Sequence, residues 1–155
     1  MDSLVVYYSK FGNTKRVAEA IAEILQSAGP VRIMNLESVS ISDLKGLNLL
    51  VVGVPTHRMN LPEEVRFMLK KYSRRILRST YVAAFDTSYE MSRWLAFFTA
   101  RRKLMLRLRR LGGKRIVRPE TFRVVEKKGP LHEGELERAK SWASSMLMRM
   151  QTIVH

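Results

Sequence analysis

Residues 4–28 read LVVYYSKFGNTKRVAEAIAEILQSA, and this stretch decides the fold. Residues 4–8 are an unbroken run of β-branched, aliphatic and aromatic residues, which predicts a parallel strand buried on both faces. From Thr14 to Ala28 the apolar residues recur at spacings of three and four, which predicts an amphipathic helix. The turn between them, residues 9–14 (SKFGNT), carries hydroxyl groups and a glycine. A strand, a polar turn and a helix in this order aim several backbone N–H groups at one point, which suits a phosphate.

The rest of the chain repeats this alternation of strand and helix. Further strands are predicted at 31–36, 47–54 and 81–85, and a last one from Ile116–Val117 and Thr121–Val125 with a bend at Pro119. The longer helices are predicted at 62–72, 92–111 and 133–150. Five alternations predict one α/β domain over residues 1–155, a doubly wound five-stranded parallel sheet with helices on both faces. Ligands of such sheets bind beyond the carboxyl ends of the strands. The loops 9–14, 55–61 and 86–94 should therefore meet.

The composition narrows the classes of function. Of the 155 residues, 46% are hydrophobic and 27% are charged, as expected for a globular chain. The absence of cysteine excludes disulfides, iron–sulfur clusters and thiol catalysis. The three histidines have no ligand spacing, so no metal site is expected. No apolar run approaches the roughly 20 residues that cross a bilayer, and Met1–Ser3 leave no room for a signal peptide. We therefore expect a cytoplasmic protein without a membrane span.

The charge is unusually positive. There are 28 lysines and arginines against 14 acidic residues, a net charge of +14. This predicts attraction to a polyanion, whether an acidic protein, nucleic acid or a membrane surface. Residues 101–118 contain nine of the basic residues and no acid. They are interpreted either as a docking surface or as a solvated helix face.

Three segments carry a resemblance to a known family. Ser9, Gly12 and Thr14 match the phosphate loop of flavodoxins, hydroxyl-any-hydroxyl-Gly-any-Thr, with Phe11 in place of the middle hydroxyl. Residues 53–56 (GVPT) are similar to the Gly-any-Pro-Thr that follows the third flavodoxin strand, and residues 129–143 (GPLHEGELERAKSWA) resemble the closing region of small flavodoxin-like proteins. The Walker pattern and the dinucleotide fingerprint fit worse, because their glycine spacings do not occur. The resemblance covers nearly the whole chain.

The resemblance to flavodoxins implies the strand order 2-1-3-4-5 and a flavin mononucleotide (FMN) cofactor. The first loop would hold the phosphate, and the other two would enclose the isoalloxazine ring, with Tyr89 stacked on one face. The implied cofactor-binding residues are Ser9, Lys10, Phe11, Gly12, Asn13 and Thr14, then Pro55, Thr56, His57, Arg58, Met59 and Asn60, and finally Asp86, Thr87, Ser88, Tyr89 and Trp94.

The function implied is that of an electron carrier between redox proteins. The basic surface predicts an acidic redox partner, with weak, non-specific attraction to nucleic acid. Two alternatives stay open. One is an FMN-dependent reductase of quinones or similar substrates, with His57 as proton donor. The other is a flavin-free binding module that uses its basic surface on nucleic acid. The sequence makes no prediction of oligomeric state.

Overall fold

The computed structural model describes residues 1–56, 61–89 and 100–154. Its centre is a parallel sheet in the order β2-β1-β3-β4-β5, with β6 also paired to β4, which confirms the predicted doubly wound architecture. The strands are β1 (Ser3–Tyr7), β2 (Val31–Asn35), β3 (Leu49–Pro55), β4 (Tyr81–Tyr89), β5 (Lys114–Arg115) and β6 (Glu120–Val124).

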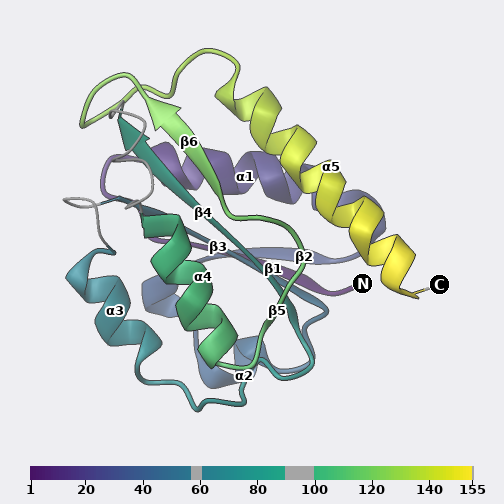
Figure 1. Cartoon of the computed structure of the whole chain (residues 1–155). Helices are drawn as coiled ribbons and strands as arrows, with labels where there is room; N and C mark the ends of the chain where they lie inside the picture. The colour runs from purple at the N-terminus through teal and green to yellow at the C-terminus, as the bar shows by residue number, and fades with distance from the viewer. Residues whose placement is uncertain (57–60, 90–99, 155) are drawn as a thin grey trace.

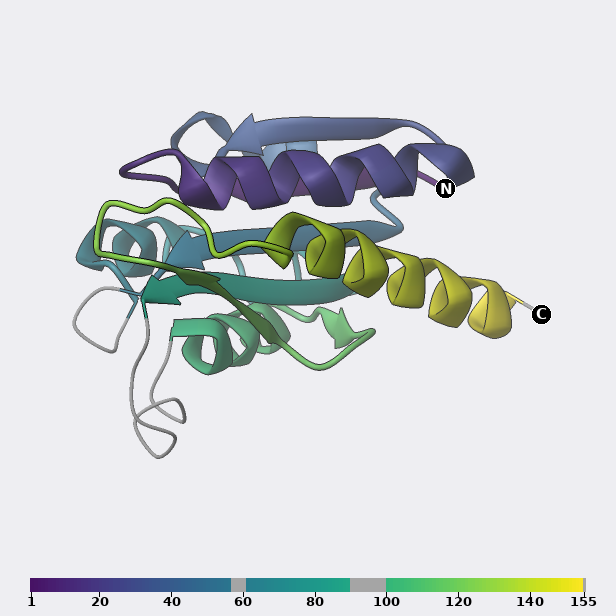
Figure 2. The same ribbon diagram turned by 90° about the horizontal axis from the view of Figure 1, so that it is seen from above.

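The helices cover both faces of the sheet (Figure 1). They are α1 (Asn13–Leu25), α2 (Ile41–Leu44), α3 (Glu63–Leu69), α4 (Ala100–Arg110) and α5 (Glu135–Val154), with short 3₁₀ turns η1 (Gln26–Ala28) and η2 (Leu36–Ser38). Helices α1 and α5 pack side by side on one face, and α2, α3 and α4 lie on the other (Figures 1 and 2). No helix in the described part of the chain is both long and apolar enough to span a membrane.

Two apolar clusters fill the space between the sheet and the helices. Within β1, Val5 faces α1 and α5, whereas Leu4 and Val6 face α3 and α4. Successive strand residues point to opposite faces, so a run without polar residues supplies both clusters at once. This explains why residues 4–6 of β1 and the whole of β3 are apolar.

The predicted last strand is two strands along the same edge of β4. Arg115 lies opposite Val82, and Glu120 lies opposite Phe85. The chain therefore advances five residues along this edge while β4 advances three. The two extra residues form a bulge that ends at Pro119, where a bend was predicted. Proline has no N–H to give to the ladder, so Pro119 contributes to the interruption. The prediction that this edge begins at Ile116–Val117 was wrong: the paired residues begin at Lys114, and Ile116 and Val117 are buried in the bulge.

Strand β4 also runs further than predicted. The sequence predicts an end at Phe85, because Asp86, Thr87 and Ser88 are polar. The structure continues the strand to Tyr89, since β3 pairs as far as Thr87 and β6 pairs as far as Tyr89. Of the helix predicted at 92–111, residues 92–99 lie outside the described residues, and α4 covers 100–110.

Candidate functional site

The carboxyl ends of the strands converge where α1 begins, as the arrowheads of β3, β4 and β6 show in Figure 2. A cleft of about 450 Å³ opens there. That size falls within the usual range for small-molecule and cofactor sites. Its lining comes from the turn before α1, the end of β3, the end of β4 and the end of β6: Ser9, Lys10, Phe11, Asn13, Thr14, Pro55, Thr56, Thr87, Ser88, Tyr89, Val124 and Lys127. The structure thus brings together residues from all three predicted loops.

The turn before α1 leaves helix donors without a side-chain cap. Gly12 is the N-cap and has φ 90°, a left-handed conformation that glycine adopts without the strain of a Cβ. Its N–H donates to Ser9 Oγ at 3.0 Å, which closes the turn. The first helical turn contains no acidic residue, and no side chain of the described residues caps the helix. The positive end of this 13-residue helix is therefore available to an anion in the cleft.

Thr14 and Thr87 connect this turn to β4. Their hydroxyl oxygens are 2.8 Å apart, and both side chains are buried. Each hydroxyl has one proton to donate and can accept two hydrogen bonds. Thr87 can therefore donate to Thr14, which frees the Thr14 proton for a ligand. The sequence places Thr87 in a different loop from Thr14, so this pairing becomes visible only with the fold.

Asp86 lies beneath the cleft and does not line it. Its side chain is fully buried, and Oδ2 accepts from the Thr56 hydroxyl at 2.7 Å and from the Arg101 backbone N–H at 3.1 Å. The Thr56 hydroxyl also accepts from the Ala100 N–H at 3.1 Å. Burial raises the pKa of Asp86, against the opposing effect of hydrogen bonds with Thr121, Thr56 and the Arg101 N–H and of the Arg101 charge. The carboxylate thus ties the end of β3 to the beginning of α4.

Two aromatic side chains are exposed at the cleft. Tyr89 at the end of β4 is 53% exposed, and Phe11 in the turn is 48% exposed. Both side chains line the cleft, where their aromatic rings could stack on a planar ligand. The predicted residues His57, Arg58, Met59, Asn60 and Trp94 lie outside the described residues.

The sequence pattern did not identify the contribution of the last strand. Val124 and Lys127 line the cleft from the end of β6 and the residues after it. Asn13 Nδ2 donates to the Lys128 carbonyl at 3.1 Å, which fastens this segment to the start of α1. The signal was present, because the carboxyl end of the last parallel strand reaches the same edge as the others. Gly12 shapes the turn without lining the cleft.

Comparison with known proteins points to one family. The family model for flavodoxin matches residues 5–142. A flavodoxin of Clostridium saccharobutylicum is 26% identical over 155 residues, covering 96% of this chain and 97% of the relative. Flavodoxin 2 of Bacillus cereus superposes with a TM-score of 0.78 at 18% identity, over 96% of this chain and 99% of that one. A flavodoxin from the domain Archaea gives 0.75 at 19% identity, over 97% and 99%.

Proposed function

The chain belongs to the flavodoxin family, and on that premise we propose that it binds FMN in the cleft at the carboxyl ends of its strands and carries electrons between redox proteins. The observation that carries the proposal is that the residues lining the cleft come from all three of the predicted loops. When bound, FMN supplies reversible storage of one or two electrons. The protein supplies position, electrostatics and exclusion of water.

The phosphate is assigned to the turn of residues 9–14. The uncapped start of α1 offers backbone N–H groups and the positive end of the helix dipole. Thr14 would donate its hydroxyl proton to the phosphate if Thr87 donates to Thr14, a direction that their 2.8 Å contact allows. Lys10 and Lys127 line the same cleft and add positive charge opposite a phosphate that carries nearly two negative charges.

The isoalloxazine ring is assigned to the space between the end of β3 and Tyr89. Pro55, Thr56 and Tyr89 all line the cleft, and the Tyr89 side chain is exposed there. Stacking of the ring on Tyr89 would cover the exposed face of this side chain. The Asp86 carboxylate holds Thr56 in place through its hydroxyl, so the wall is fixed before the ring arrives.

The partner proposed is an acidic redox protein. A net charge of +14 attracts acidic surfaces and raises the rate of encounter at low salt. Nucleic acid would be attracted by the same field, with little sequence preference.

The test compares FMN with riboflavin, which lacks the phosphate, in titrations of the flavin-free protein. The wild type should bind FMN more tightly. Thr14→Ala should weaken FMN binding roughly ten- to a hundredfold, because one hydrogen bond to a charged group is lost, and should leave riboflavin binding nearly unchanged. Thr14→Ser keeps the hydroxyl and should retain most of the affinity. Equal weakening of both flavins by Thr14→Ala would place the phosphate elsewhere.

The same titrations locate the ring through flavin fluorescence. Stacking on Tyr89 should quench the fluorescence, so Tyr89→Ala should restore part of it and weaken both flavins, whereas Tyr89→Phe should change neither. Unchanged quenching in Tyr89→Ala would show that the ring does not stack on Tyr89.

Rapid turnover of a quinone with a chemical reductant would favour a reductase instead of a carrier. Failure to bind any flavin would favour a flavin-free binding module.

A further inference from the structure

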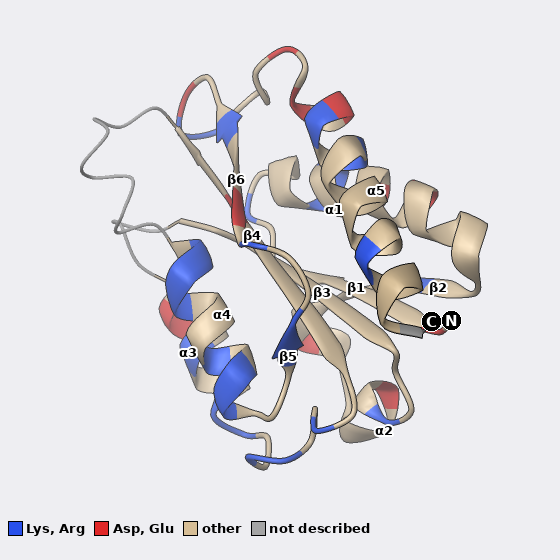
Figure 3. Ribbon diagram, turned by 45° about the vertical axis from the view of Figure 1, so that its right-hand side comes forward, with Lys and Arg blue, Asp and Glu red and all other residues tan. Residues whose placement is uncertain are grey.

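A second hollow, of about 520 Å³, lies between α4 and the bulge that joins β5 to β6, and its rim is made of arginine. The arginines are Arg101, Arg102, Arg109, Arg115 and Arg118. Figure 3 shows the basic residues running along α4 and across β5, on the face away from α5. This hollow is separate from the cleft assigned to FMN.

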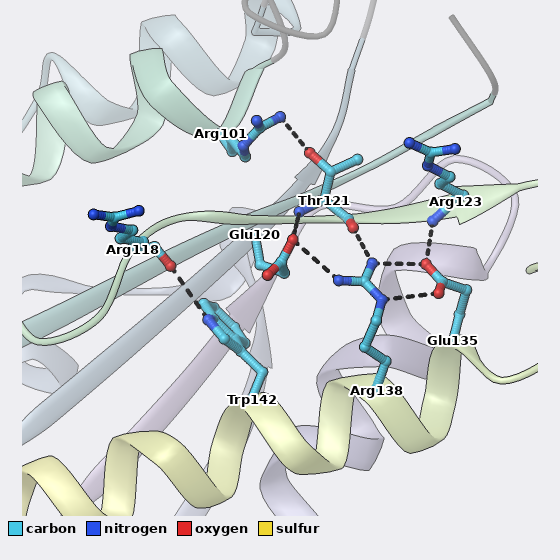
Figure 4. Close-up of polar contacts among 8 residues, drawn as sticks. All are labelled: Arg101, Arg118, Glu120, Thr121, Arg123, Glu135, Arg138 and Trp142. Atoms are coloured by element: carbon cyan, nitrogen blue, oxygen red, sulfur yellow. Dashed lines mark hydrogen bonds and ion pairs between the residues drawn. The ribbon is translucent and has the colours of Figure 1, made fainter. Parts of the chain in front are cut away.

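These side chains come from two elements, α4 and the segment from β5 to β6. On α4, Arg102 and Arg109 lie two turns apart on one stripe, while Leu104 and Leu108 on the other side are buried against the sheet. Arg115 is the last residue of β5, and Arg118 precedes the proline of the bulge. Trp142 of α5 donates its indole N–H to the Arg118 carbonyl at 3.2 Å, and the Arg118 side chain points away from α5 (Figure 4).

The acids near this hollow are engaged elsewhere. Glu120 is the first acidic residue after Arg101 in the sequence, and it forms a salt bridge with Arg138 of α5 at 3.0 Å (Figure 4). No carboxylate of the described residues lies within salt-bridge distance of Arg109, Arg115 or Arg118. These three exposed guanidinium groups repel one another across the hollow, screened only by water and salt. A ligand with several negative charges would relieve this repulsion.

The floor of the hollow is apolar and the rim is charged. Met105 and Pro119 contribute to the floor, and Leu106 is 50% exposed beside them. Guanidinium groups bind planar oxoanions such as carboxylates through paired hydrogen bonds. An apolar floor suits a hydrophobic side chain placed between such carboxylates. The described lining contains no aromatic residue on which a nucleic-acid base could stack, so a protein segment fits better than a single strand of nucleic acid.

The hollow adjoins the wall of the flavin cleft. At the start of α4, the Arg101 N–H donates to Asp86 and the Ala100 N–H donates to Thr56, which lines that cleft. The arginines of the first turn of α4 therefore stand beside the rim of the cleft. We propose that the hollow binds a carboxylate-rich segment of an acidic redox protein and holds that partner next to the flavin. The redox role of the partner rests on the proposed function, whereas binding of the acidic segment does not.

The experiment uses the full chain and a labelled, capped heptapeptide of six glutamates around one leucine, with binding followed by fluorescence anisotropy at low and high salt. Combined Arg109→Glu, Arg115→Glu and Arg118→Glu should weaken binding at low salt at least about tenfold and flatten its salt dependence. The matched control is Lys45→Glu, Lys70→Glu and Lys71→Glu, three exposed residues outside the hollow whose reversal changes the net charge equally. The control should keep most of the affinity. Equal losses in both triple variants would show a general charge effect and overturn the proposal.

Two further measurements distinguish paired hydrogen bonds from charge alone, and a peptide ligand from nucleic acid. Replacing the same three arginines by lysine preserves charge but not the paired hydrogen bonds, and should weaken the peptide several-fold. An oligothymidylate of ten nucleotides that binds more tightly than the peptide, and is lost with the same Glu variant, would assign the hollow to nucleic acid and overturn the proposal. Circular dichroism of every triple variant should match that of the wild type, which shows that each variant folds, and FMN affinity should stay close to that of the wild type. A wild type that binds the peptide but no flavin would leave this proposal standing and remove the redox function.

Discussion

Asp86 is a buried acidic residue that joins two elements at the base of the cleft. It is fully buried, and its Oδ2 holds both Thr56 and the start of α4. Burial raises the pKa of Asp86, so the folded protein binds this proton more tightly than the unfolded chain does. The stability linked to that proton is fully present below the unfolded pKa. It is lost as the pH rises through the folded pKa.

The wild type should lose stability as the pH rises above about 4, whereas the Asp86→Asn variant, which has no carboxyl group to ionise there, should not. The amide oxygen can still accept from Thr56 and Arg101, and any constant cost of the substitution is the same at every pH. Between the unfolded and the folded pKa, each pH unit costs the wild type about 1.4 kcal/mol relative to the variant. Urea unfolding at pH 4, 5.5 and 7 measures this difference. A free-energy difference between wild type and variant that does not change with pH would contradict the assignment.

Asp43 provides the control of opposite sign. Backbone and side-chain hydrogen bonds from Ser40, and then the Arg32 guanidinium, lower the pKa of this carboxylate. Its contribution is present above the unfolded pKa and is lost as the pH falls. Asp43→Asn should therefore lose stability near neutral pH and approach the wild type in acid.

Residue identity predicted part of the site and could not predict the rest. Ser9, Gly12 and Thr14 were recognisable because the turn, the left-handed glycine and the helix start are local in the sequence. The contact of Thr14 with Thr87 joins residues 73 positions apart. Its existence depends on the register of β4, which no local pattern reveals. Asp86 was among the cofactor-binding residues that the resemblance to flavodoxins implies, but it lies within β4 and does not line the cleft.

At the scale of elements, β3 and β4 fit together through a glycine. A Cβ added to Gly53 would lie 1.9 Å from the Phe85 ring, which is fully buried. Phe85 in turn makes edge-to-face contacts with Phe122 of β6 and Trp142 of α5. The glycine of the GVPT motif is thus required by packing on the face that carries α1 and α5.

Gly53→Ala should cost about 1–3 kcal/mol or more of unfolding free energy, because the methyl group overlaps the ring. Phe85→Leu removes the overlapping atoms, so the same glycine substitution should cost much less in that background. Thermal and urea unfolding of the four proteins of this cycle measure the coupling. Equal costs in the two backgrounds would show that Phe85 is not the limiting contact.

The central elements were predictable and the edges were not. Strands β1 and β3 are short runs that are apolar on both faces, a pattern that predicts a buried parallel strand. The end of β4 is polar, and its strand conformation comes from pairing with β6, a segment more than 30 residues away. The division of the last strand into β5 and β6 reflects a two-residue bulge, which depends on the partner strand as much as on Pro119.

Across the whole molecule, the two faces of the sheet differ in how charge is compensated. On the α5 side, Arg138 binds Glu120 and Glu135 (Figure 4). Its guanidinium group also lies over the Phe122 ring. Burial opposes ionisation of Glu135, but hydrogen bonds from Arg138 and the Arg123 N–H prevail and lower its pKa. On the α4 side, nine basic residues between 101 and 118 have no acid among them in the sequence. Within this stretch, no neighbouring acid in the sequence offsets the positive charge.

This imbalance predicts how salt affects stability. Salt weakens attraction in ion pairs and repulsion between like charges alike, but exposed ion pairs contribute little to stability, and half-buried ones such as Arg138 with Glu135 are screened less. Repulsion within a chain of net charge +14 acts against the compact state. Potassium chloride raised from about 0.01 M to about 0.3 M should therefore increase Tm by several degrees, where roughly 2–4 °C corresponds to 1 kcal/mol for a chain of this size.

The control for this prediction is the triple variant of the arginine hollow. Each Arg→Glu reversal changes the charge by two, so Arg109→Glu, Arg115→Glu and Arg118→Glu together lower the net charge from +14 to +8. The variant should have a higher Tm than the wild type at low salt and a smaller rise with salt, because less repulsion remains to be screened. Calorimetry of both proteins over the same salt series measures the two slopes. A Tm that falls with salt in the wild type would mean that attractive pairs, not repulsion on the α4 face, dominate the electrostatics of the fold.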